Sequence, residues 1–219
     1  MKNPFRSIVA LLALLATLGL SLSAAAQDAK AGEKKAAMCI GCHGIPDYKA
    51  TFPEVYRVPK IAGQNAKYII SALGQYKKGD RKHPTMRGIA ASLSDQDIAD
   101  LAAFYATEAP SEPAPVALTG AVPGDVAELL KKGNCASCHG ANFTTPIDPS
   151  YPKLAGQHGD YLYIALREYQ TDKNALVGRN NAIMMGMARP FTPAEAKILA
   201  AYFASLPTEL KTVPQSRFR

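Results

Sequence analysis

The 219-residue chain carries its only four cysteines in two nearly identical phrases, CIGCHG at 39–44 and CASCHG at 135–140. Each phrase contains Cys-x-x-Cys-His, which is the attachment signature of c-type haem. The two thiols add to the vinyl groups of the porphyrin, and the adjacent histidine becomes the proximal ligand of the iron. The pattern therefore predicts two covalently attached haem c groups, one at each copy.

The repeat extends well beyond the cysteines. PKIAGQ at 59–64 recurs as PKLAGQ at 152–157. From Arg81 onward the two halves align without a gap, and Arg81 aligns with Arg179. Only the loops between the cysteine motif and Arg81 differ in length, and loops are where a duplicated domain tolerates insertions. The chain is therefore predicted to be a tandem repeat of one domain.

Each repeat is predicted to be helical. Ser94 and Thr192 stand where helix N-caps belong, each with an acidic residue three positions later. A second helix is expected over 68–76 and 161–169, and another before each cysteine pair, whereas no segment shows the alternation typical of a strand. We predict an all-α fold of two tandem domains, each wrapped around one haem. Such small, alanine-rich domains need a bound group to complete their core.

The N-terminus has the layout of a secretory signal peptide, because Lys2 and Arg6 precede a short apolar run that ends in three alanines. Export predicts a periplasmic protein, and a leader that stays uncleaved would leave peripheral membrane association open. The predicted organisation is a signal peptide at 1–26, a first domain at 27–110, a Pro-rich linker at 111–122, a second domain at 123–210 and a basic tail at 211–219.

The charge favours protein partners over nucleic acid. The formal charge is +7, but removing Lys2 and Arg6 leaves 23 basic against 18 acidic residues, which is +5. Each ferric haem with two ionised propionates adds about −1, which leaves a net charge of about +3. The basic residues are scattered and form no stripe of the kind that binds nucleic acid. Steering toward an acidic patch on a redox partner remains the expected role of this charge.

Paired cysteines have two other common uses in proteins. Two Cys-x-x-Cys pairs can supply the four thiolates of a structural zinc site. A single pair can act as a thioredoxin-like redox motif, but that motif needs a βαβ context that the sequence lacks. Neither alternative explains why His-Gly follows each pair, or why each repeat has a methionine at the same downstream position.

A methionine is the expected sixth ligand of each iron. Met86 is the only downstream methionine of the first repeat and follows His43 by 43 residues. The second repeat offers Met184, Met185 and Met187, of which Met184 aligns with Met86. Met185 is the main alternative, and for Met185 and Met187 we expect core gap-filling.

Two further histidines could compete for these roles. His83 could ligate the first iron and give a bis-histidine site, but the second repeat has Asn181 at that position, so a shared mechanism favours methionine. His158 is expected at the surface.

The residues around the ligands also allow predictions. Pro59 and Pro152 are expected to offer carbonyl groups to the ring N–H of the two haem-motif histidines. Arg81 and Arg179, each five residues before a candidate methionine, could pair with haem propionates. The alternative for both arginines is a solvated surface charge.

With CIGCHG, PKIAGQ and Met86 in the first repeat, and CASCHG, PKLAGQ and Met184 in the second, the chain resembles the dihaem cytochrome c4 family from about residue 29 to residue 206. The resemblance implies two helical class I cytochrome c domains related by approximate twofold symmetry, with propionate edges facing across the interface. The implied thioether residues are Cys39, Cys42, Cys135 and Cys138, and the implied axial ligands are His43, Met86, His139 and Met184.

The resemblance implies electron delivery in the periplasm, from a respiratory donor complex and commonly toward a terminal oxidase. Because an iron with histidine and methionine has no open position, we expect outer-sphere electron transfer and no enzymatic activity. One alternative is a cytochrome subunit that accepts electrons from a flavin or quinoprotein dehydrogenase. Another is a peroxidase or gas sensor, which needs an open or displaceable sixth position.

Overall fold

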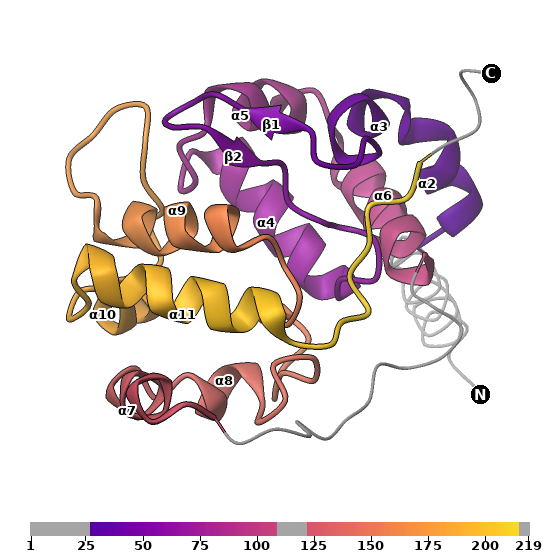
Figure 1. The fold of residues 1–219 in the computed structure, drawn as a ribbon. Coiled ribbons are helices and arrows are strands. Elements are labelled where there is room, and N and C mark those ends of the chain that lie inside the picture. The colour runs from indigo at the N-terminus through magenta and orange to yellow at the C-terminus, as the bar shows by residue number, and fades with distance from the viewer. Residues whose placement is uncertain (1–26, 109–121, 215–219) are drawn as a thin grey trace, which may run out of the picture.

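The computed structural model describes residues 27–108 and 122–214, and this part of the chain is mostly helical (Figure 1). The expected signal peptide at 1–26, nearly all of the linker and residues 215–219 lie outside the described residues. The first domain contains α2 (Ala29–Lys35), α3 (Ala37–His43), β1 (Lys49–Ala50), β2 (Tyr56–Arg57), α4 (Ala66–Lys78), α5 (Pro84–Ala91) and α6 (Asp95–Thr107). The second domain contains α7 (Gly124–Lys132), α8 (Ala136–His139), α9 (Gly159–Gln170), α10 (Ala182–Ala188) and α11 (Pro193–Ser205). None of these helices is long and apolar enough to cross a membrane.

The predicted helices are confirmed. α4 and α9 cover the two expected tyrosine-rich segments, and α2 and α7 precede the two cysteine pairs. Both capping boxes form: the Ser94 hydroxyl accepts from the Asp97 amide and the Thr192 hydroxyl from the Glu195 amide, while each acid accepts from the amide of its cap. A cap of this kind is typically worth about 1 kcal/mol, because it pairs N–H groups that the first turn leaves open.

A short hairpin in the first domain contradicts the expectation that no strand would form. β1 and β2 pair antiparallel, with Lys49 opposite Arg57 and Ala50 opposite Tyr56. Each strand has only two residues, which is too short for any alternation to show in the sequence. The Tyr56 ring is buried and lies 6.3 Å from the Tyr161 ring of α9. Contact with the other domain thus helps to place the hairpin.

Each domain has its own apolar core, built on its last helix. α6 packs against α2 and α4, and α11 packs against α9 and α7. Leu101 and Leu199, which are equivalent in the repeat, are each 1% exposed at the two centres. Cys39 packs against the edge of the first core and Cys135 against the edge of the second. The haem motif therefore borders the apolar interior of each domain.

Two buried glutamines connect the domains by reciprocal hydrogen bonds. The Gln64 amide accepts from the backbone N–H of Lys153 at 2.9 Å and donates to its carbonyl at 3.1 Å. The Gln157 amide makes the same two bonds with Lys60: it accepts from the backbone N–H at 2.9 Å and donates to the carbonyl at 2.8 Å. These are the glutamines of the repeated PKxAGQ phrases. Such reciprocity is what a twofold axis between like units produces.

The same symmetry is seen at the backbone of two arginines. Arg81 and Arg179 pair as an antiparallel bridge across the domain boundary. Two reciprocal backbone hydrogen bonds flank this pair, from Lys82 N to Gly178 O at 2.9 Å and from Asn180 N to Asp80 O at 2.7 Å. The approximate twofold axis therefore passes between Arg81 and Arg179.

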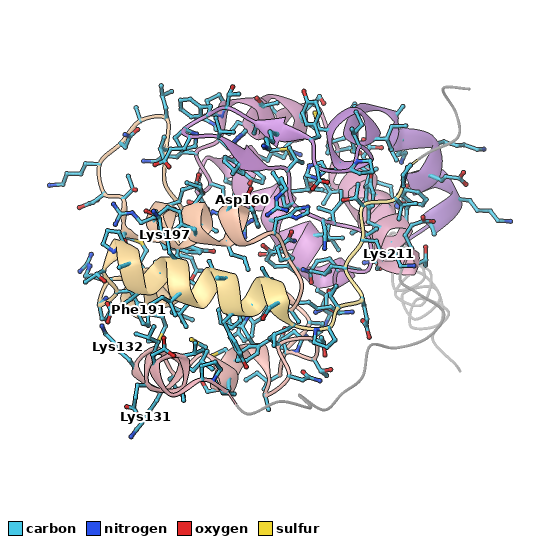
Figure 2. The ribbon with its side chains drawn as sticks, in the orientation of Figure 1. Lys131, Lys132, Asp160, Phe191, Lys197 and Lys211 are labelled. Atoms are coloured by element: carbon cyan, nitrogen blue, oxygen red, sulfur yellow. The ribbon has the colours of Figure 1, made fainter. Side chains whose placement is uncertain are left out.

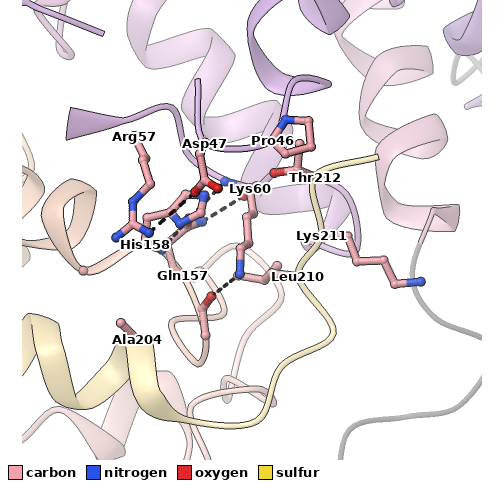
Figure 3. A pocket seen from close by; sticks show the side chains of 12 residues that line it. Pro46, Asp47, Arg57, Lys60, Gln157, His158, Ala204, Leu210, Lys211 and Thr212 are labelled. Carbon is pink, nitrogen blue, oxygen red and sulfur yellow. Dashed lines mark hydrogen bonds and ion pairs between the residues drawn. The ribbon is translucent and has the colours of Figure 1, made fainter. Parts of the chain in front are cut away.

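A cavity of about 530 Å³ lies at another part of the boundary and is lined by polar side chains of both domains (Figure 3). There Arg57 donates to Asp160 from its backbone N at 3.0 Å and its Nε at 3.1 Å, and Lys60 Nζ donates to the Gly156 carbonyl at 2.7 Å. His158, which we expected at the surface, lines this cavity and is half-buried. This part of the interface is held by polar contacts.

The C-terminal segment returns from the second domain to the first. Leu210 is 3% exposed, the Lys211 amide donates to the Ala62 carbonyl at 2.9 Å, and Val213 packs against the first core. Residues 211–214 of the predicted basic tail thus cross the domain boundary.

We expect Gln64→Ala and Gln157→Ala each to lower the free energy of unfolding by about 1–3 kcal/mol, because each leaves a backbone N–H and C=O of the other domain unpaired. Denaturant unfolding of the haem-loaded protein measures this, with the exposed Lys78→Ala on α4 as the control. Two variants as stable as the control would show that the amide bonds do not hold the domains together.

Candidate haem sites

The first site is built on α3. Cys39 and Cys42 lie three residues apart, so a helix presents both thiols on one face, and His43 ends the same helix. The Nδ1 atom of His43 lies 2.9 Å from the Pro59 carbonyl oxygen. Because a carbonyl can only accept, Nδ1 must carry the proton, and Nε2 is left free to ligate a metal.

The second site repeats this arrangement around α8. Cys135 and Cys138 again lie one helical turn apart, and His139 is 7% exposed. Its Nδ1 donates to the Pro152 carbonyl at 3.0 Å. The expected proline carbonyls are therefore confirmed in both domains. Burial lowers the pKa of both haem-motif histidines, which favours the neutral imidazole that a metal requires.

The four thiols are free and lie in two different sites. Burial raises the pKa of Cys39, and it raises that of Cys135 to about 11. Within the described ranges, no group of three or more His, Cys, Asp or Glu side chains could hold a metal ion. The zinc alternative is therefore wrong. The strands of the described residues form only the small hairpin, so a thioredoxin-like βαβ context is absent there too.

The two candidate methionines occupy equivalent places. Met86 is the third residue of α5, and its amide donates to the ring of the N-cap His83 at 3.3 Å. Met184 is the third residue of α10, and its amide donates to the side chain of the N-cap Asn181 at 3.0 Å. The repeat is thus preserved in three dimensions at these positions.

The remaining methionines of the second domain differ from each other. Met185 is half-buried, as Met184 is, whereas Met187 is 43% exposed. The expectation that Met187 fills a core gap is therefore wrong, because its side chain is exposed.

The two arginines are not surface charges. Arg81 is 4% and Arg179 is 6% exposed. Arg81 donates from Nε to the Gln75 amide oxygen at 2.9 Å and from Nη2 to the Tyr68 hydroxyl at 3.2 Å, and it stacks on the Tyr68 and Tyr76 rings. The surface alternative is wrong for both.

Arg179 has the corresponding contacts on α9, with one change. Its Nε donates to a carboxylate oxygen of Glu168 at 2.6 Å, and its Nη2 donates to the Tyr161 hydroxyl at 3.3 Å. Burial lowers the pKa of Arg179, but Tyr161 and Glu168 more than offset this and keep the pKa well above its ordinary value. The Gln75–Glu168 difference was missed in the sequence, although alignment of the flanking tyrosines would have revealed it.

These residues fit covalent haem. In each domain two free thiols lie one helical turn apart at the edge of an apolar core, and the next histidine is fixed through Nδ1 with Nε2 available. This combination is what attachment and proximal ligation require. The geometry thus defines a protein with two c-type haem sites.

Comparison with known proteins supports the same class. The family model named Cytochrome c matches residues 29–107 and 125–207. The chain is 34% identical to cytochrome c4 of Pseudomonas aeruginosa, over 90% of this chain and 98% of that protein. It is 32% identical to a thiosulfate dehydrogenase electron acceptor of Stutzerimonas stutzeri, over 89% and 94%. The solved cytochrome c4 of Acidithiobacillus ferrooxidans is 27% identical, with a TM-score of 0.58, over 78% and 99%.

The fold and the two sites define a c-type cytochrome of two tandem domains, each with one covalent haem c. The chain belongs to the cytochrome c family and, within it, to the dihaem cytochrome c4 family. It is an electron carrier rather than an enzyme. Electron-transfer partners follow from that role.

We expect Gly140→Ala to lower stability by about 1–3 kcal/mol, because this glycine has a backbone conformation that other residues rarely adopt. Its φ is 78° and ψ is 157°, and a Cβ would lie 2.0 Å from the Thr145 carbonyl oxygen. Since Gly140 follows His139 directly, the yield of haem-loaded protein should fall as well.

The control is Gly124→Ala at the start of α7, where a Cβ meets nothing within 4 Å. We expect its unfolding free energy to change by less than about 1 kcal/mol. Equal effects of the two substitutions would show that the backbone at Gly140 is not constrained.

Proposed function

We propose that His43 and Met86 close the first iron, that His139 and Met184 close the second, and that the protein carries electrons in the periplasm by outer-sphere transfer. The observation that carries this proposal is the repetition of one ligand framework. In both domains a proline carbonyl orients the histidine, and a capped helix places a methionine at its third position.

Bound haem would supply the change between ferric and ferrous iron, and the residues of the chain would keep the proposed ligand set unchanged during this change. Each histidine is fixed at Nδ1, and each candidate methionine lies in the first turn of a helix whose N-cap accepts from its amide. Little reorganisation of such a ligand set is needed when one electron arrives or leaves. The role of His83 as a cap, accepting through Nδ1, supports methionine over a bis-histidine site.

For the partners, we propose electron uptake from a respiratory donor complex and delivery to a terminal oxidase. Similarity to a protein named thiosulfate dehydrogenase electron acceptor supports a dehydrogenase as a second candidate donor. Lys131 at the end of α7 and Lys197 on α11 are exposed and lie on one side of the second domain, where Lys132 is already paired with Glu195 at 2.7 Å (Figure 2). Such charges favour transient, salt-sensitive contact with an acidic patch on the partner.

Carbon monoxide tests the ligand assignment, because it binds ferrous haem only where the sixth position is open or labile. We expect no spectral change when the reduced protein is titrated. Met86→Leu and Met184→Leu should each admit carbon monoxide at one of the two haems, whereas the matched control Met185→Leu should stay closed.

If carbon monoxide binds to the Met185→Leu variant but not to the Met184→Leu variant, the choice of Met184 as the sixth ligand is contradicted. Binding to the unchanged protein would contradict a closed pair of irons and favour the sensor or peroxidase alternative.

Partner choice is tested with stopped-flow kinetics. We expect reduction by a thiosulfate dehydrogenase supplied with thiosulfate, or by a respiratory donor complex, and oxidation by a terminal oxidase. Both rate constants should fall as salt rises, because exposed charges steer the encounter. If the oxidase does not oxidise the reduced protein at any salt concentration, delivery to an oxidase is wrong.

A further inference from the structure

The two arginines at the twofold axis have partners of different charge. Nε of Arg179 donates to the carboxylate of Glu168 at 2.6 Å, and both side chains are less than 10% exposed. Nε of Arg81 donates to the neutral amide oxygen of Gln75 at 2.9 Å. Among the described residues, the Arg179–Glu168 ion pair has no counterpart at Arg81.

Gln75 and Glu168 are equivalent positions in an otherwise repeated cluster. Each lies seven residues after the tyrosine whose hydroxyl meets the arginine, and each precedes the second tyrosine on which the arginine stacks. Arginine, two tyrosines and the backbone bridge are common to both domains. The remaining difference is one amide in place of one carboxylate, which is one unit of charge.

The residues that flank the two arginines in the chain do not cancel that difference. Asp80 and Lys82 flank Arg81 and are opposite in charge, while the corresponding residues in the second domain are the uncharged Gly178 and Asn180. The first cluster therefore has a net charge of +1 and the second has none.

The carboxylate of Glu168 lies within the second domain's own structure. α9 carries it, and the Tyr161, Leu162 and Leu166 side chains of the same helix pack in or against the core that Cys135 borders. Glu168 is 6% exposed, so counter-ions and water screen its field weakly. Because α9 packs on the core of the second domain, we expect the haem of that domain to respond to this charge more than the other haem does.

We propose that Glu168 lowers the reduction potential of the haem in the second domain and so biases a shared electron toward the first domain. A nearby negative charge favours ferric over ferrous iron, because ferric iron carries one more positive charge. The bias concerns one electron, which leaves the second iron as it becomes ferric and enters the first as it becomes ferrous; no bond or proton moves. The inference rests on the proposed electron-transfer function.

The field of Glu168 also reaches the facing domain. Burial, Tyr76 and Glu168 all raise the pKa of Tyr56 on the hairpin of the first domain. We therefore expect Glu168 to act on both haems with the same sign, and more strongly on the second.

The test is potentiometric titration of the haem-loaded protein, with each midpoint assigned to its domain from the haem methyl resonances in NMR spectra. Glu168→Gln should raise the midpoint of the second haem more than that of the first. Gln75→Glu should lower the midpoint of the first more than that of the second. In the double variant, which keeps the total charge, the two midpoints should move in opposite directions.

A matched control removes the same charge from the surface of the second domain. Glu128 on α7 is exposed, so Glu128→Gln should shift both midpoints less than Glu168→Gln does, and high salt should remove its effect but not that of Glu168. Glu168→Gln is expected to fold, because Gln75 shows that an amide satisfies the arginine Nε. If Glu168→Gln does not bind haem, Gln75→Glu by itself tests whether a carboxylate at this position lowers the midpoint potential of the haem in its own domain.

Unchanged midpoints in Glu168→Gln, with or without a loss of stability, would assign Glu168 a purely structural role and overturn the proposal. A larger shift at the first haem would overturn it too. The proposed function is judged separately, by carbon monoxide binding to the unchanged protein, so the two ideas can fail independently.

Discussion

The hydrogen bond from each haem-motif histidine to a proline carbonyl is the constraint on which each domain depends. It holds the proton on Nδ1 and leaves Nε2 available, so a loop outside the cysteine motif decides the orientation of the imidazole ring. The same loop continues into the glutamine that bonds the other domain. The orientation of the imidazole ring and the docking of the two domains therefore depend on one short segment.

The interface combines symmetry with a few departures from it. Duplicated segments meet through reciprocal bonds, at the two glutamines and at the backbone of the two arginines, because like surfaces facing each other repeat each contact. The departures occur where the two copies have diverged in sequence. They are the hairpin of the first domain, the returning C-terminal segment and the carboxylate of Glu168.

Much of the fold was predictable because its signals are local. Ser94 and Thr192 cap helices through residues three positions away, and the cysteine motif spans five residues. The failures depend on distant contacts. The hairpin is placed partly by α9. For the arginines the sequence left two alternatives, and the surface alternative was excluded only by burial at the domain boundary, where their backbones pair. Met187 was misjudged because the tendency of methionine to fill core gaps does not say whether a particular side chain is buried.

By itself the sequence determined the chemistry of this protein: two pairs of thiols, each with an adjacent histidine, in a duplicated helical chain. These features need only neighbouring residues, so no knowledge of folding was required to see them. Only the tertiary structure decided that Arg81 and Arg179 meet at a twofold axis, and that one of them has a buried carboxylate partner. The physical reason is that charge acts through space, and folding brings together groups that lie far apart along the chain.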